Sequence, residues 1–138
     1  MIKIQNDPIN IEDIQREIKD DYSGADVIFL GTVRKTDESK KILRHFTMNH
    51  MMPWPKKASI KSLTMRKKKM YDINKVCVIQ RKGYVRLNEI SIGIGVSSFH
   101  RKDAFMACEY IIDKIKELPP IWKKDIYDDG TEEWKSEL

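Results

Sequence analysis

The chain has 138 residues, with 26 Lys or Arg and 21 Asp or Glu, so its formal net charge at pH 7 is +5. This length suits one domain with its own hydrophobic core and is too short to divide comfortably into two. No apolar run reaches the roughly 20 residues that span a bilayer, and the N-terminus lacks the layout of a signal peptide. We therefore expect a single cytoplasmic domain over residues 1–138, with no membrane partner.

The positive charge is compatible with nucleic acid, an anionic metabolite or an acidic protein partner, and charge alone does not choose among them. Basic residues are densest between Lys56 and Lys69, on an expected helix, where a run of charges is usually a solvated face. No RNA-binding signature and no row of interleaved aromatic residues accompanies them. We expect no nucleic acid ligand, and a basic nucleic-acid-binding module remains the least favoured alternative.

Two cysteines, Cys77 and Cys108, lie inside apolar stretches without a CxxC motif. This pattern supports neither a disulfide framework nor a zinc site. Two buried thiols are the favoured interpretation. A sulfur-carrying cysteine is a minor alternative, because nothing nearby in the sequence would lower a thiol pKa. We expect no metal and no cofactor.

The first half of the chain alternates strands and helices. Residues Met1 to Ile4 predict a short edge strand, and Asn10 is a plausible N-cap for a helix over about Ile11 to Lys19. The apolar run from Ala25 to Val33 is typical of a strand buried on both faces. The elements expected next are a polar loop over Lys35 to Lys41, a strand over Ile42 to Asn49 and a helix from about Lys57 to Tyr71.

The second half begins with a strand over Val76 to Ile79 and a turn over Gln80 to Gly83. Residues Ile90 to Val96 then alternate bulky and small side chains with a period of two. One face of this strand is therefore nearly bare backbone, and something must approach that face closely. Another element of the same fold is the favoured occupant, with a ligand or partner as the minority alternative.

An apolar stripe of helical period begins after Arg101 and stops before Pro119-Pro120, which predicts a helix between them. Ser97 or Ser98 is its candidate N-cap. We find no internal repeat and no glycine-rich phosphate loop. The order of elements predicts an α+β or mixed α/β fold with one sheet.

The candidate functional residues are cations, since no pair of carboxylates, HExxH motif or nucleophile elbow occurs. Arg34 closes an apolar strand, and His100 and Arg101 stand where a strand passes into a helix N-terminus, which favours anions. An equally good interpretation is that His100 caps the helix and that Arg101 is a surface residue.

Lys116, Lys123 and Lys124 bracket the Pro-Pro break. Clustered lysines repel one another, which lowers the pKa of at least one and supplies a neutral amine as base or nucleophile. Three solvated lysines are the commoner outcome for such a cluster. Arg101 and Lys116 are 15 helical positions apart, or about 22 Å. If both serve one small substrate, the site is composite and a second copy of the chain supplies one helix end.

Together these residues resemble the large, catalytic subunit of molybdopterin synthase. The resemblance is carried by Gly31 to Arg34, by Ser97 to Arg101 with Ala104-Phe105 following, and by Lys116 with Pro120 to Asp125. It implies a mainly antiparallel, α/β-hammerhead-like fold with about three helices. It also implies a sulfurtransferase of molybdenum cofactor biosynthesis, which converts cyclic pyranopterin monophosphate (precursor Z) to the dithiolene molybdopterin.

In that family the sulfur arrives as a thiocarboxylate on the C-terminal glycine of a small ubiquitin-like subunit. The family's assembly is a central dimer of large subunits with a small subunit at each end. Carried over to this chain, Lys116 and Lys123 would be the catalytic lysines. The implied substrate-binding residues are Thr32, Val33, Arg34, His100, Arg101, Lys116, Lys123, Lys124 and Asp125.

The chain departs from the family pattern in two places. Gln80 stands where a histidine is usual before Arg81, and Met48 to Pro55 replace a segment that commonly carries a glutamate and tyrosines. Neither departure touches the two catalytic lysines. A catalytically inactive scaffold that binds a ubiquitin-like protein is the main alternative to the enzyme, and the presence of the cationic residues argues against it.

Overall fold

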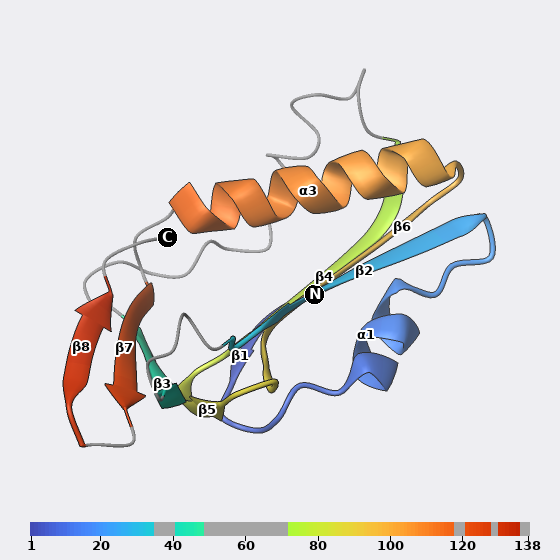
Figure 1. The fold of residues 1–138 in the computed structure, drawn as a ribbon. Coiled ribbons are helices and arrows are strands. Elements are labelled where there is room, and N and C mark those ends of the chain that lie inside the picture. The colour runs from blue at the N-terminus through green and yellow to red at the C-terminus, as the bar shows by residue number, and fades with distance from the viewer. Residues whose placement is uncertain (35–40, 49–71, 118–120, 128–129, 136–138) are drawn as a thin grey trace.

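A computed structural model of the chain describes residues 1–34, 41–48, 72–117, 121–127 and 130–135 (Figure 1). Within these ranges the backbone forms eight strands and two helices. The elements are β1 (Ile2–Gln5), α1 (Ile11–Ile18), β2 (Ala25–Thr32), β3 (Lys41–Met48), β4 (Ile73–Arg81), β5 (Gly83–Arg86), β6 (Ile90–Ser98), α3 (Arg101–Glu117), β7 (Ile121–Tyr127) and β8 (Glu132–Lys135).

The strands form two four-stranded sheets, in the order β1-β4-β6-β2 and β5-β3-β7-β8. β1 pairs in parallel with β4, and the other pairings within the described ranges are antiparallel. The α+β class and the mainly antiparallel pairing are therefore confirmed. The prediction of one sheet is wrong, because the chain passes from the first sheet to the second between β4 and β5.

The turn expected over Gln80 to Gly83 is also wrong in its bounds. Gln80 and Arg81 belong to β4, Gly83 begins β5, and only Lys82 lies between the strands. Gly83 has φ +89°, in the left-handed region that glycine adopts at little cost. This one residue redirects the strand into the second sheet.

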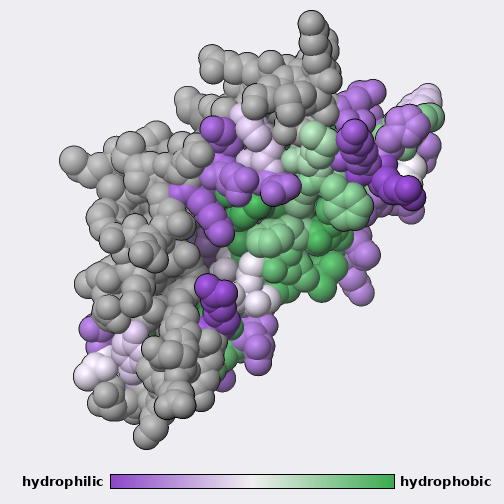
Figure 2. Space-filling view, turned by 45° about the horizontal axis from the view of Figure 1, so that its top comes forward, coloured by the Kyte–Doolittle hydropathy of each residue, from purple (hydrophilic) through white to green (hydrophobic). Residues whose placement is uncertain are grey.

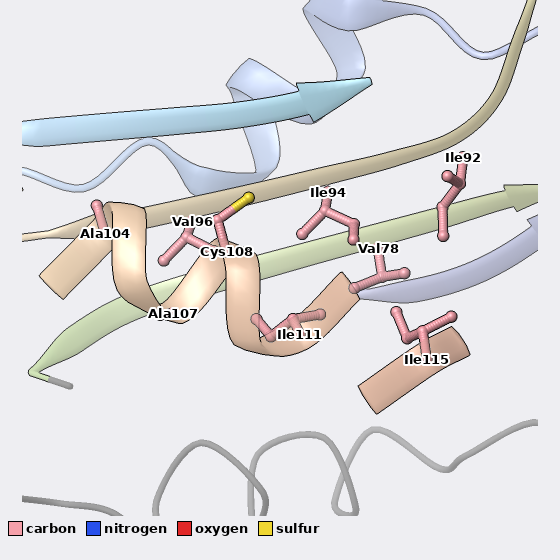
Figure 3. Packing of buried hydrophobic residues seen from close by; sticks show 9 residues of the cluster. All are labelled: Val78, Ile92, Ile94, Val96, Ala104, Ala107, Cys108, Ile111 and Ile115. Carbon is pink, nitrogen blue, oxygen red and sulfur yellow. The ribbon is translucent and has the colours of Figure 1, made fainter. Parts of the chain in front are cut away.

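α3 and α1 cover opposite faces of the first sheet (Figure 1). On the α3 face, alternate residues of β6 meet the apolar stripe of the helix, which confirms the predicted helical pattern (Figure 3). Each residue of this cluster is at most 7% exposed. The cluster consists of Val78, Ile92, Ile94, Val96, Ala104, Ala107, Cys108, Ile111 and Ile115.

On the other face, the small residues of β6 receive α1. A Cβ atom added at Gly93 would overlap Ile14 Cδ1, and one at Gly95 would lie 2.5 Å from Ile14 Cγ2. Ile14 and Ile18 are both fully buried there. The bare face of the predicted strand is thus occupied by another element of the same fold, which confirms the favoured interpretation.

Local signals at the ends of α1 also match the sequence. The Asn10 side chain accepts a hydrogen bond of 2.9 Å from the Glu12 amide, which confirms the predicted N-cap. At the other end, Lys75 Nζ donates to the Lys19 carbonyl at 2.9 Å, a favourable place for a cation. The short helix is therefore fixed at both ends as well as along its buried face.

Other expectations concerned the cap of α3, the chain after Pro119-Pro120 and two segments in the middle of the sequence. The Ser98 hydroxyl donates to the His100 carbonyl, and the buried Ser97 hydroxyl has no hydrogen-bond partner in the described part of the chain, so the expected serine cap of α3 is not observed there. β7 and β8 follow the Pro-Pro break, where no strand was predicted. Residues 35–40 of the expected loop lie outside the described residues, and so does the whole of the helix expected over 57–71.

Neither of the two described helices is both long enough and apolar enough to cross a bilayer.

Candidate functional site

The first sheet has two ends, and the predicted site residues divide between them. In the antiparallel pair of β2 and β6, Ala25 lies opposite Ser98, whereas Thr32 lies opposite Ile90. α3 begins just after β6 and runs back along the sheet (Figure 1). His100 and Arg101 therefore lie at one end, here called the His100 end. Arg34 and Lys116 lie at the opposite end, here called the Arg34 end.

The second sheet brings β7 to the Arg34 end. Arg44 of β3 pairs with Val85 of β5 on one side and with Asp125 of β7 on the other. Val85 in turn packs against the buried Val33. Asp125 and Val85 lie on either side of β3, so their backbones are two strand spacings, or roughly 10 Å, apart. β7 therefore passes close to the residue that precedes Arg34. The side chains of Lys123, Lys124 and Asp125 lie outside the described part of the structure.

Thr32, Val33 and Arg34 have different environments although they are consecutive. Thr32 and Arg34 are exposed, and Val33 is completely buried between Val85 and Leu87. The Val33 amide donates to the Glu89 carbonyl at 3.1 Å, and its carbonyl accepts from the Asn88 amide at 2.8 Å. Both backbone groups of Val33 are therefore bonded within the chain. Val33 fixes the backbone from which Arg34 projects.

The His100 end presents basic side chains beside exposed aromatic rings. His100 and Arg101 are both exposed, at the start of α3. The ring of Phe99 meets that of His100 edge-on, with centroids 4.8 Å apart. Phe99 and Phe105 are 60% and 62% exposed, although they are large apolar side chains. Figure 2 shows an apolar area bordered by hydrophilic side chains on the face turned toward the viewer.

A cavity of about 960 Å³ opens near the Arg34 end, between the β4–β5 crossing, the β5–β6 turn and the end of β7. Its lining was not predicted from the sequence. The residues are Arg81, Tyr84, Arg86, Leu87, Glu89, Ile126 and Tyr127. They come from two stretches of the chain, 81–89 and 126–127, and no motif in the sequence marks the two stretches as neighbours.

Glu89 is held in this cavity by two hydrogen bonds. Its Oε2 accepts from Arg81 Nη1 at 2.7 Å, and its Oε1 accepts from the Arg86 amide at 3.0 Å. The Arg81 hydrogen bond, followed by that of the Arg86 amide, lowers the pKa of the Glu89 carboxyl. The carboxylate is therefore charged at neutral pH and joins three segments of the chain.

Gln80, at the position where the resemblance led us to expect a histidine, is buried in β4, and its side-chain amide donates to the Arg81 carbonyl at 3.0 Å. The cysteines are also buried and free, as predicted. Burial raises the pKa of the Cys77 and Cys108 thiols from 9.0 to about 11. Among the described residues, no three or more His, Cys, Asp or Glu side chains gather as a metal site would require.

The sequence matches a family model described as MoaE protein over residues 4–118. The chain belongs to this family. The resemblance inferred from the three motifs is therefore confirmed. The matched range includes Arg34, His100, Arg101 and Lys116, and Lys123 lies just beyond it.

Individual relatives extend the match over nearly the whole chain. The molybdopterin synthase catalytic subunit of Thermoplasma volcanium is 38% identical over 135 residues, which cover 96% of both chains. That of Bacillus subtilis is 35% identical over 96% of this chain and 82% of its own length. A Drosophila melanogaster relative with the same name is 35% identical, and the match covers 36% of its length.

Two solved structures share the fold. Molybdopterin synthase from Staphylococcus aureus superposes with a TM-score of 0.84 at 34% identity, over 96% of this chain and 94% of that chain. A complex of subunits 1 and 2 of molybdopterin-converting factor from Helicobacter pylori gives a TM-score of 0.69 at 22% identity, over 96% of this chain and 88% of that chain. The second likeness concerns the fold alone.

Proposed function

We propose that this chain is the catalytic subunit of a molybdopterin synthase. It would convert cyclic pyranopterin monophosphate to molybdopterin, with sulfur from the thiocarboxylated C-terminus of a small ubiquitin-like subunit. The observation that carries the proposal is the 38% identity, over 96% of both chains, to a molybdopterin synthase catalytic subunit. No metal takes part in the proposed step.

Arg34, His100 and Arg101 would bind the phosphate of the pterin. Arg34 is exposed and follows the buried Val33, so its backbone is fixed while its guanidinium reaches solvent. His100 and Arg101 lie at the N-terminus of a 17-residue helix, where backbone amides and the helix dipole favour an anion. The exposed Thr32 would line the same wall, with Val33 as its support.

Lys116 and Lys123 would be the catalytic residues. The thiocarboxylate sulfur would attack a side-chain carbon of the pterin, so that a C–S bond forms and a C–O bond breaks, with the oxygen leaving as water or phosphate. Water would then hydrolyse the thioester between that sulfur and the small subunit, which leaves the sulfur on the pterin and a carboxylate on the small subunit. A second thiocarboxylated subunit would supply the second sulfur in the same way. A lysine ammonium would stabilise the developing negative charge, and a lysine amine would transfer protons. Lys124 and Asp125, on the same strand as Lys123, would complete the substrate-binding residues.

The separation of the two ends supports a composite site. α3 spans about 25 Å at 1.5 Å per residue, so His100 and Arg101 of one copy lie far from its own Lys116. In a two-fold dimer, the His100 end of one copy would meet the Arg34 end of the other. The exposed Phe99 and Phe105 fit such a buried contact. We infer a homodimer that binds one small subunit at each end.

The experiment that tests this function combines the purified protein with a thiocarboxylated small subunit and cyclic pyranopterin monophosphate. The product is measured through its oxidised fluorescent derivative. We expect turnover by the natural chain and a loss of at least about 100-fold for Lys123→Ala. Lys3→Ala is the matched control, because Lys3 is exposed on the edge strand β1, pairs with Ile79 between the two ends of the sheet, and should leave turnover unchanged.

Binding of the small subunit is measured in parallel. Lys123→Ala should keep the complex, whereas loss of the complex would make the lysine a structural residue. A natural chain that binds the small subunit but forms no product would be an inactive scaffold. A chain that neither binds the subunit nor forms product would overturn the proposed function.

A further inference from the structure

Arg34 is fixed to the rest of the fold through its neighbour Val33. The pairing of β2 with β6 shifts between Gly31 and Thr32, and Thr32, opposite Ile90, is the last paired residue of β2, so the ladder does not set the path of the chain beyond Thr32. The Val33 backbone bonds instead to Asn88 and Glu89, in the turn between β5 and β6. The position of Arg34 therefore depends on the position of this turn.

The turn needs support of its own. Asn88 has φ 67°, an uncommon value for a residue other than glycine, and the Glu89 amide closes the turn on the Arg86 carbonyl at 3.1 Å. A three-residue connection of this kind can shift unless something fixes it against the neighbouring strands. The Glu89 carboxylate supplies that contact.

Glu89 connects the turn to two strands at once. Its carboxylate binds the Arg86 amide at the end of β5 and the Arg81 guanidinium at the end of β4. The Arg81 side chain is only 12% exposed, and its Nε also donates to the Asn6 carbonyl at 3.3 Å. A charged pair held in a fixed geometry by further hydrogen bonds contributes more than a mobile surface pair.

We propose that Glu89 and Arg81 are positioning residues for substrate binding, which act by holding the turn that holds Val33 and thereby Arg34. This inference rests on the proposed function, in which Arg34 binds the phosphate of the pterin. Neither residue needs to touch the substrate. Their loss should weaken substrate binding while leaving the chemical step, assigned to Lys116 and Lys123, nearly unchanged.

The first test measures KM and kcat separately, at saturating small subunit. Glu89→Gln keeps the shape of the side chain and an oxygen for the Arg86 amide, but removes the charge that binds Arg81. We expect it to raise KM for cyclic pyranopterin monophosphate by about fivefold or more, with kcat within about twofold of the natural value. Arg81→Gln breaks the same pair from the other side and should give the same result.

The second test repeats both changes in an Arg34→Ala background. If Glu89 and Arg81 act through Arg34, neither change should raise KM further once Arg34 is absent. An equal rise in both backgrounds would overturn the proposal, because the pair would then act directly on the substrate or on the fold as a whole. Asp13→Asn is the matched control, since it removes an exposed ion pair with Arg16 in α1 and should leave KM unchanged.

Hydrogen exchange gives a readout that does not depend on activity. Glu89→Gln should speed exchange of the Val33 amide by about fivefold or more, while amides in the centre of β6 keep their protection. Unchanged exchange at Val33 would overturn the proposal. A rise in KM for Arg34→Ala without one for Glu89→Gln would overturn it and leave the proposed function intact. If Arg34→Ala leaves KM unchanged, both the assignment of Arg34 to the phosphate and this inference are overturned.

Discussion

At the scale of single residues, burial decides what the two thiols can do. Cys77 faces α1 and Cys108 lies in α3, so the two sulfurs pack on opposite faces of the first sheet. A reactive cysteine needs an accessible thiolate, usually stabilised by a nearby cation or helix N-terminus. Burial does the reverse here, since it disfavours the charged form. Sulfur chemistry by this chain's own cysteines is therefore disfavoured.

We predict slow reaction of both thiols with a disulfide reagent in the folded protein. With the pKa at about 11 instead of 9.0, the thiolate fraction at pH 8 falls about 100-fold, and burial slows access further. The rate of labelling at pH 8 should rise by at least that factor when urea unfolds the chain. Rapid labelling of one cysteine in the native protein would contradict this prediction and revive a sulfur-carrying role.

The same pKa shifts predict the sign of an alkaline effect on stability. The unfolded thiols lose their protons near pH 9, whereas the folded thiols keep them up to about pH 11. Unfolding therefore releases protons in this window, and the free energy of unfolding should fall as pH rises from 9 to 11. The fall should be shallower in a Cys77→Ala, Cys108→Ala double variant, which controls for the titration of lysines and tyrosines.

At the scale of elements, the contact of α1 with β6 depends on two glycines. Gly93 and Gly95 let the α1 side chains approach the strand backbone, and each would bring an added methyl group into Ile14. The atoms concerned differ, however. Gly93 faces Cδ1 at the flexible end of Ile14, whereas Gly95 faces Cγ2, next to the backbone, with Ile18 also close.

This difference predicts that shortening Ile14 restores stability to a Gly93 variant but not to a Gly95 variant. Gly93→Ala and Gly95→Ala should each lower the free energy of unfolding by about 1–3 kcal/mol through overpacking. Ile14→Val removes Cδ1 but keeps Cγ2, so in that background the cost of Gly93→Ala should fall by at least about half and the cost of Gly95→Ala should not. Urea unfolding of the four single and double combinations measures both effects. Equal rescue of both glycine variants would show that α1 moves as a unit to relieve the overlap.

The elements predicted well from the sequence are those whose signals are local. The alternation in β6, the apolar stripe of α3 and the cap at Asn10 each lie within a few neighbouring residues, and each is confirmed. β7 was missed because its charged run resembles a solvated cluster, and its pairing partner β3 lies far away in the sequence. Such a strand is set by its neighbours in space more than by its own composition.

In the candidate site, too, the sequence indicates the residues that belong to local motifs and not those brought together by the fold. Arg34, His100, Arg101 and Lys116 were proposed as site residues because they belong to motifs. Helix length already separated Arg101 from Lys116, but the sequence could not place Arg34 at the same end of the sheet as Lys116. The Glu89–Arg81 pair was missed because its geometry depends on the left-handed Asn88 and on the passage between two sheets. Neither feature leaves a distinctive local pattern, and the fold alone brings the two charges together.

At the scale of the whole molecule, the length of α3 makes the proposed active site a property of two copies. If each site takes Lys116 from one copy and Arg101 from the other, two inactive variants can complement each other. A mixed dimer of Lys116→Ala and Arg101→Ala contains one site with both defects and one site with neither. Random exchange makes half of the dimers mixed, so activity should recover to about a quarter of the natural value.

The matched control for complementation combines two defects that belong to the same copy. Lys116 and Lys123 both lie at the Arg34 end of one chain, so a mixture of Lys116→Ala and Lys123→Ala leaves every site with one defect and should recover no activity. The measurement is turnover after the paired variants are unfolded and refolded together, with each variant refolded alone for comparison. Recovery in both mixtures would show subunit exchange without a shared site. Recovery in neither, with mixed dimers present, would place His100 and Arg101 outside the active site and assign them to the dimer contact.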